Sequence, residues 1–228
     1  MYVVCSVLAG VVTGVAAFAA DFAPDPAGRI LLAIASSGFS WGLVAFIVGY
    51  FAPARRVAAT ASVGALALAV ITYYVLILLL SDRWRQPLGS SSVSKLDEFS
   101  PVMRAAAFWM LGALLGGLIL GCLAQLARAG CPRNSGIAFG VAFGLLAGEA
   151  IYTIFYFAFV WVGPLDSFVW ARLQPAVLQL LLAAAATSVA LWFRRGTLFF
   201  PAAIAAGAIS TTASVAIWHL VQTARVTL

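Results

Sequence analysis

Long apolar segments alternate with short polar segments along the whole chain. Runs of about 18 or more apolar residues recur, and each is long enough to cross the ~30 Å hydrocarbon layer of a membrane as a helix. The polar segments between them contain prolines, glycines, serines and charged residues, which are typical of turns. The pattern predicts seven transmembrane helices, at about residues 2–20, 30–51, 57–80, 105–127, 136–162, 173–193 and 197–221.

Composition supports the same fold class. Hydrophobic residues make up 64% of the 228 residues and charged residues 9%, whereas about a quarter of the residues of a soluble domain are charged. No segment remains for a separate soluble domain. The sequence therefore predicts an all-α, polytopic bundle in which residues 1–228 form a single integral membrane domain, with the lipid bilayer as its surroundings.

The basic residues predict the topology and argue against nucleic-acid binding. The net charge is +6, but the arginines are spread over short loops instead of forming a stripe. The connections after the second, fourth and sixth helices contain no acid. By the positive-inside rule they are cytoplasmic, as is the N-terminus. The excess of arginine over lysine is typical of a GC-rich genome, so we expect the inner membrane of a bacterial cell. These connections contain Arg55, Arg56, Arg128, Arg133, Arg194 and Arg195.

Residues 136–162 form the longest apolar run and contain a row of glycines spaced four apart: Gly136, Gly140, Gly144 and Gly148. On a helix, residues four apart lie on one side, and glycine rows allow membrane helices to approach to backbone contact. We predict helix packing through this row, and homo-oligomers could form through such faces.

Glu149 is the candidate catalytic residue because it is the only acid inside a predicted membrane helix. Such acids are rare and usually functional. Tyr152 and Tyr156 follow on the same broad side of the helix, and Tyr73 and Tyr74 reach a similar depth from the third helix. We predict that these four tyrosines line a substrate-binding cavity around Glu149, completed by Ser and Thr groups of the second and seventh helices.

Two roles for Glu149 remain open. It could bind a ligand, carry a proton or act as an acid catalyst, or it could be a packing group that donates a hydrogen bond to a serine or a backbone carbonyl. No other predicted helix has a charged group at its depth, so we expect the neutral acid. A weak internal repeat aligns residues 63–74 with 143–154, and Ala69 then corresponds to Glu149. The fold therefore does not require the acid.

Other chemistry is not indicated. The only histidine, His219, has apolar neighbours at the outer end of the seventh helix, where an interfacial position is the simplest interpretation. One histidine cannot supply a catalytic triad with its partners or a metal-binding motif. The three cysteines show no metal-ligand spacing. We predict no metal site and no cofactor.

Three segments carry a resemblance to a known family: GRILLAIASSGFSWGLVAFIVGY (residues 28–50), GALALAVITYY (64–74) and LLAGEAIY (145–152). They resemble a family of small actinobacterial membrane proteins of unknown function. The resemblance covers the first five helices and implies the membrane class, without a mechanism. The long polar loop at 81–104 departs from the family pattern.

The sequence leaves three functions open. The first is binding, and acid-catalysed cyclisation or isomerisation, of an isoprenoid- or lipid-like substrate in an aromatic cavity, as in membrane-bound terpene cyclases. The second is proton-coupled transport by Glu149, which favours helices broken at the midplane; the predicted helices have no interior proline, because Pro175 and Pro201 lie near helix starts. The third is a non-catalytic partner subunit packed through exposed glycines.

Overall fold

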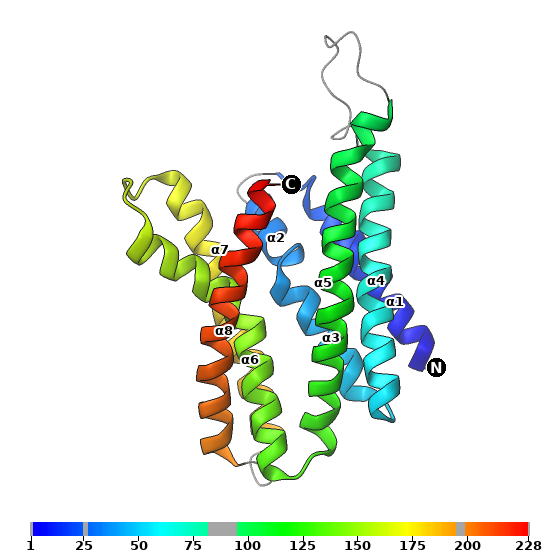
Figure 1. Ribbon diagram of the computed structural model, residues 1–228, viewed down its shortest axis with the longest axis vertical. Coiled ribbons are helices and arrows are strands. Elements are labelled where there is room, and N and C mark those ends of the chain that lie inside the picture. The colour runs from blue at the N-terminus through cyan, green and yellow to red at the C-terminus, as the bar shows by residue number, and fades with distance from the viewer. Residues whose placement is uncertain (1, 25–26, 82–94, 195–198, 228) are drawn as a thin grey trace.

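The computed structural model describes residues 2–24, 27–81, 95–194 and 199–227, and the regular structure in these ranges is entirely helical (Figure 1). The predicted all-α fold is confirmed. The helices are α1 (Tyr2–Ala20), α2 (Ala27–Ala35), α3 (Gly38–Phe51), α4 (Arg55–Leu80), α5 (Lys95–Ala129), α6 (Pro132–Phe155), the π-helix η2 (Tyr156–Val160), α7 (Ser167–Arg194) and α8 (Phe200–Thr227).

Six helical segments of the described residues are long and apolar enough to cross a membrane: α1, α4, α5 from Phe99, α6 with η2, α7 and α8. The protein is therefore a multi-pass membrane protein. The second predicted helix, at residues 30–51, is wrong as a continuous element. It is divided into α2, of 9 residues, and α3, of 14 residues. Neither reaches the ~20 residues that a crossing needs.

The two largest differences from the predicted helix starts are at α5 and α7, which begin much earlier than predicted. α5 begins at Lys95, and α7 begins at Ser167 because Asp166 caps it: its Oδ1 accepts hydrogen bonds from the backbone N–H groups of Phe168 and Val169, at 3.0 and 3.1 Å. Pro101 and Pro175 consequently lie inside α5 and α7. The prediction that no helix contains an interior proline was wrong, because it placed these helix starts too late.

The bundle contains two pairs of parallel helices. α1 packs along α4, and α6 packs along α8, while α3 and α5 lie between the two pairs and contact both α4 and α6 (Figure 1). Glycines make these approaches possible. A Cβ on Gly14 would lie 2.6 Å from the carbonyl oxygen of Ala69, and one on Gly144 would lie 2.5 Å from the backbone nitrogen of Thr211. Residues with a side chain at these glycines would push the helices apart.

The predicted packing through the glycine row of residues 136–148 is confirmed. All four of its glycines are buried, and each faces α8. This row is therefore used within the chain. Homo-oligomerisation through glycine faces stays a prediction, for which Gly112 and Gly116 on α5 are the more open candidates.

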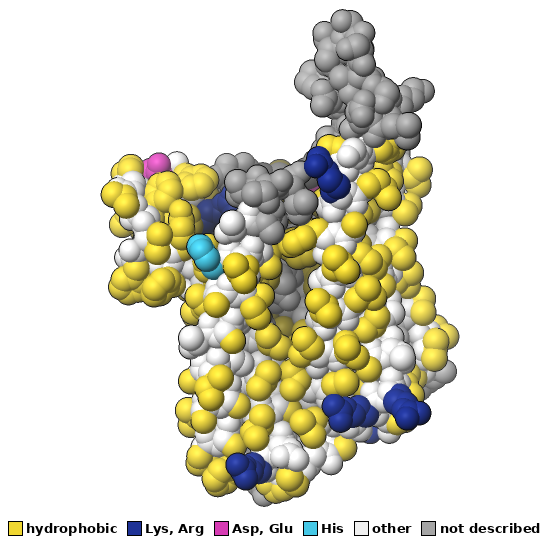
Figure 2. Space-filling model, viewed as in Figure 1, with side chains coloured by type: hydrophobic (Ala, Val, Ile, Leu, Met, Phe, Trp, Pro, Cys, Tyr) yellow, Lys and Arg dark blue, Asp and Glu magenta, His cyan; other side chains and the backbone are white. Residues whose placement is uncertain are grey.

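Four arginines lie together at one end of the bundle. α4 and α6 begin where α5 ends, so Arg55, Arg56, Arg128 and Arg133 share the same end, whereas Arg104 lies near the start of α5 toward the opposite end. Hydrophobic side chains cover the flanks of the helices on the face shown in Figure 2, and dark blue side chains mark its lower end. This distribution is typical of a membrane protein.

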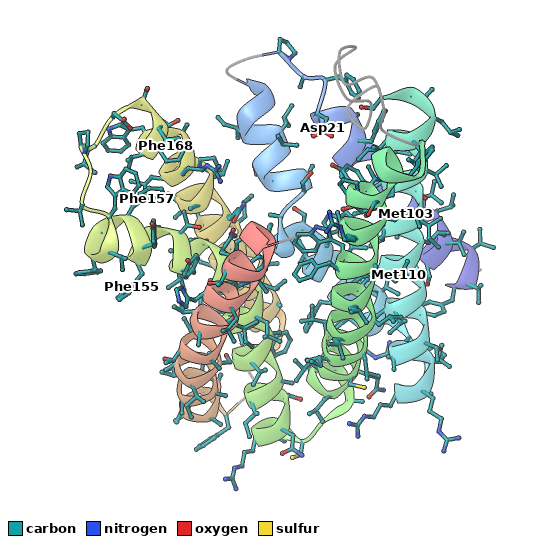
Figure 3. All side chains as sticks on the ribbon, turned by 45° about the horizontal axis from the view of Figure 1, so that its top comes forward. Asp21, Met103, Met110, Phe155, Phe157 and Phe168 are labelled. Atoms are coloured by element: carbon teal, nitrogen blue, oxygen red, sulfur yellow. The ribbon has the colours of Figure 1, made fainter. Side chains whose placement is uncertain are left out.

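The end of α6 leaves the bundle. The π-helix η2 follows it directly, and the chain returns through α7, so that this hairpin projects sideways in Figure 1. Aromatic rings hold it together: Phe157 lies 6.4 Å from Phe168 and 5.6 Å from Trp161, centroid to centroid, in edge-to-face arrangements (Phe157 and Phe168 are labelled in Figure 3).

Candidate functional site

The candidate site is organised around the break between α2 and α3, at residues 36–37. Serine side chains compete for backbone hydrogen bonds, and glycine is a weak helix former, so the sequence Ser36-Ser37-Gly38 favours an interruption. Ser37 has extended backbone angles (φ −87°, ψ 155°) and is the N-cap of α3: its hydroxyl accepts a hydrogen bond from the N–H of Ser40 at 3.3 Å.

The carbonyl end of α2 is satisfied by nearby side chains. The carbonyl oxygen of Ile34 accepts hydrogen bonds from the hydroxyls of Ser37 and Ser40, at 2.6 and 2.7 Å. The indole Nε1 of Trp41 donates to the carbonyl oxygen of Ala35 at 2.9 Å. These contacts matter because unpaired backbone groups are costly inside a membrane. The whole set lies within eight consecutive positions, so this side of the break is locally encoded.

The amide end of α3 is satisfied from far along the chain. The backbone N–H of Gly38 donates to Oε2 of Glu149 at 2.8 Å, across 111 residues. A helix N-terminus carries a partial positive charge that favours a carboxylate, and a hydrogen bond to an ionised acceptor contributes about 1.5–3 kcal/mol. Glu149 therefore connects α6 to the broken helix. We refer to this hydrogen bond as the α3–α6 contact.

In the α3–α6 contact, Oε2 of Glu149 accepts a hydrogen bond from a backbone N–H group. The functional role and the packing role considered from the sequence both stay predictions. Glu149 is half-buried, and the hydroxyl of Thr153 donates to its backbone carbonyl at 2.9 Å.

Trp218 on α8 covers the α3–α6 contact from the side. A Cβ on Gly38 would lie 2.6 Å from Cζ2 of Trp218 and 3.3 Å from Oε2 of Glu149, so the indole and the carboxyl group both approach this glycine. A Cβ on Gly148 would lie 3.4 Å from the Trp218 ring. Three helices thus meet at the site, and glycines provide the room on two of them.

Two of the four tyrosines predicted to surround Glu149 lie on its helix and its continuation. Tyr152 is one turn further along α6, 6.2 Å from the ring of Tyr156 and 6.0 Å from the ring of His219. Both tyrosines are half-buried, and His219 is exposed. This aromatic group lies at the α6–α8 side of the site. Its role as a substrate-binding surface stays a prediction.

The other two tyrosines belong to a different part of the bundle. The Tyr73 hydroxyl donates to Oδ2 of Asp21, just after α1, at 3.3 Å (Asp21 is labelled in Figure 3). Tyr74 packs against the core formed by α3, α4, α5 and α6, as Trp109 and Met110 also do. The structure does not gather the four predicted tyrosines into one group, since α4 packs on α1, α3 and α5. Their part in binding a substrate stays a prediction.

A separate cavity of about 510 Å³, open to the surface of the bundle, lies between α6, α7 and α8. Ile151 contributes to its wall from α6. Ile151 and Glu149 are two positions apart, a rotation of about 200° around a helix. The cavity and the α3–α6 contact therefore lie on opposite sides of α6.

Sequence reasoning found Glu149 but missed its partners. Gly38 and Trp218 were not singled out as site residues, whereas Ser37 was among the serines of the second predicted helix that were expected to complete the cavity. A signal for two of them was present, because Ser37 followed by glycine and by Ser40 is a helix N-cap pattern. The long-range pairing of Gly38 with Glu149 has no local signal.

No group of three or more His, Cys, Asp or Glu side chains placed to hold a metal ion occurs among the residues with described positions. Comparisons of the chain with protein-family models, with curated proteins and with solved structures find no match.

Proposed function

We propose that this protein is a small proton-coupled transporter in which Glu149 carries the proton and α3 is the element that moves. The observation that carries the proposal is the α3–α6 contact: an ionisable side chain bound to the amide end of a broken helix. Broken helices with termini facing ions or substrates recur at the binding sites of transporters, and acids at membrane depth are usually functional.

The α3–α6 contact responds to a proton through simple electrostatics. An ionised Glu149 attracts the amide end of α3 by charge and by a charge-assisted hydrogen bond. Protonation removes the charge and weakens both attractions. Each 1.4 kcal/mol of attraction lost raises the ratio of separated to contacting helices about tenfold. The carbonyl end of α2 is bonded by Ser37, Ser40 and Trp41 at the start of α3, so α2 keeps these hydrogen bonds when it moves together with α3 away from α6.

The proposed setting is the inner membrane of a bacterial cell. The shared arginine-bearing end of α4, α5 and α6 supports a cytoplasmic position for that end. The N-terminus of α1 lies toward the same end, because Tyr2 donates a hydrogen bond to the carbonyl of Val48 near the end of α3.

The test measures the distance between the two sides of the site. Spin labels replace the exposed residues Ser36 and Phe155 in a variant without the native cysteines, and distances are recorded by electron–electron resonance between about pH 5 and pH 9. We expect the distance distribution to change with pH in the parent. In Glu149→Gln it should not change, because the amide keeps an acceptor oxygen and cannot titrate.

Asp166→Asn is the matched control. It makes the same chemical change in the exposed N-cap of α7 and should leave the pH response intact. A parent distance distribution that stays constant over the whole pH range would overturn the proposal. Solid-supported membrane recordings with a panel of amino acids, sugars, organic acids and lipophilic amines then identify the solute class: proton-coupled current is expected in the parent and not in Glu149→Gln.

Acid-catalysed conversion of a lipophile, in the manner of a terpene cyclase, is the second candidate. The cavity between α6, α7 and α8 favours a lipophilic ligand. Its position on the far side of α6 places a ligand away from the Glu149 carboxyl group, and for this reason we rank transport first. Mass spectrometry of co-purifying molecules distinguishes the two: a different chemical species in parent and Glu149→Gln supports catalysis, and the same species supports transport.

A further inference from the structure

The cavity between α6, α7 and α8 combines a large apolar wall with a few hydroxyl groups. Its volume is about 510 Å³, which lies within the ~300–1,000 Å³ range of small-molecule sites. Phe139 and Phe143 of α6 and Phe200 of α8 supply aromatic surface, and Gly140 and Gly207 form an indented wall where α6 and α8 approach each other.

Three hydroxyl-bearing residues line this cavity: Thr187 and Ser188 of α7, and Thr211 of α8. Hydroxyls in membrane helices usually bond to the carbonyl four residues earlier. Thr13, Thr153, Thr212 and Thr223 follow this rule here. The three hydroxyls of the cavity wall make no hydrogen bond to any residue whose position the structure describes.

The hydroxyls of Thr72 and Ser214 also make no hydrogen bond to a described residue, but they have no free space beside them. Thr72 is packed against Gly14, and Ser214 against Gly148, at distances that leave no room even for a Cβ on the glycine. The three cavity hydroxyls differ because they adjoin an open volume. An unpaired hydroxyl in apolar surroundings costs about 1–3 kcal/mol, and a ligand with a hydrogen-bonding group would remove that cost.

The hydroxyls lie near the middle of the cavity. Ala183 packs with Leu146 and Ala147. Because α7 runs against α6, Thr187, one turn further along α7, lies near Phe143. Thr211 lies beside Gly144. Ile151 lines one end of the cavity beyond this level and Phe200 the other, so apolar walls extend on both sides of a central polar band.

We propose that this cavity binds a neutral lipophile that carries a hydroxyl or carbonyl group between two apolar arms. None of the lining residues is charged, so a charged head group would remain unpaired. At about 30 Å³ for each water-sized group, the volume accommodates roughly 17 non-hydrogen atoms. This site does not depend on the transport function, since binding there can be measured in the absence of any proton gradient.

The test uses three probes of similar size, each with a photoactivatable diazirine: 8-hexadecanol, 1-hexadecanol and hexadecane. Purified protein in nanodiscs is titrated with each probe, irradiated, and mapped by mass spectrometry. We expect saturable labelling of α6, α7 and α8 around the cavity, with the highest affinity for 8-hexadecanol because only its hydroxyl reaches the polar band when both arms are buried.

Variants separate this site from general lipid contact. Thr187→Val/Ser188→Ala/Thr211→Val should lower the affinity for 8-hexadecanol about tenfold, the equivalent of one or two lost hydrogen bonds, and leave hexadecane unchanged. Ala208→Phe fills the cavity and should abolish saturable labelling by all three probes. Thr212→Val is the matched control, since that hydroxyl is exposed and bonded to the backbone.

Labelling that is unsaturable and spread over all lipid-facing helices would identify the cavity contents as bulk lipid and overturn the proposal. Equal affinity of the triple variant and the parent for 8-hexadecanol would also overturn it. Unchanged elution and thermal unfolding of each variant show that the change in binding is not a loss of fold.

Discussion

The α1–α4 pair and the α6–α8 pair are built in the same way but are used differently. In both, two parallel helices approach to backbone contact through glycines, as Gly14 does at Ala69 and Gly144 at Thr211. Ala69 is completely buried in the first pair, whereas Glu149, which aligns with it in the sequence, reaches out of the second pair to the amide end of α3. Close packing of such a pair therefore needs no acid, and Glu149 instead connects its pair to α3.

The largest expected effect comes from disrupting the glycine contacts on which both the α1–α4 pair and the α6–α8 pair depend. Gly144→Leu places a side chain where the backbone of Thr211 already lies, and Gly14→Leu does the same at Ala69. We expect each to lower the free energy of unfolding by about 3 kcal/mol, because backbone atoms cannot move aside as a side chain can. Thermal unfolding followed by tryptophan fluorescence measures this.

Gly64→Leu on the exposed face of α4 is the control for both variants, since no atom of a neighbouring helix lies within 4 Å of a Cβ at that position. It should unfold at the parent temperature. If it were as damaging as Gly144→Leu, the loss would reflect lipid exposure or helix propensity instead of helix contact.

An intermediate effect should come from replacing Glu149, the residue that distinguishes the α6–α8 pair from the α1–α4 pair. Glu149→Ala leaves the amide of Gly38 without this acceptor in an apolar environment, which costs about 1–3 kcal/mol. Glu149→Gln retains an acceptor oxygen and should cost less than half as much. Denaturation in mixed micelles compares the two, and equal destabilisation would show that charge, and not the hydrogen bond, holds α3 to α6.

The smallest effect is expected on the local side of the helix break. Ser37→Ala removes the N-cap of α3 and one donor to Ile34, and should cost about 1 kcal/mol. Ser40 still donates to the same carbonyl, which limits the loss. The same denaturation assay tests this, with Thr60→Val on the exposed face of α4 as the control. If Ser37→Ala lowered the free energy of unfolding more than Glu149→Ala, the local hydrogen bonds would stabilise the break between α2 and α3 more than the α3–α6 contact does.

Most of the fold could be predicted because hydrophobic length is a property of each segment alone. The break between α2 and α3 could not be predicted in that way, because apolar residues continue through positions 30–51 on both sides of three small polar serines. Hydropathy averages over such residues, while the backbone responds to each one. Asp166 had a similar local effect: it begins α7 inside what reads as a loop.

The site was only partly predictable for a different reason. The depth of Glu149 follows from its place in one helix, but its partner, Gly38, is fixed by how α3 and α6 pack. The same holds for Tyr73, whose hydroxyl bonds to Asp21. From the sequence, Tyr73 and Tyr152 have similar depths, and depth alone does not determine which side of a helix faces which neighbour.

The α3–α6 contact also makes the amide hydrogen of Gly38 a probe of how often α3 separates from α6. The amide hydrogen of Gly38 is bound to a carboxyl group on another helix, so it exchanges with solvent deuterium only when the two helices part. Amides inside a helix exchange by fraying or by global unfolding, whereas this one reports a local opening. Its exchange rate, followed by isotope-edited spectroscopy of this one glycine, therefore measures the rate at which α3 separates from α6.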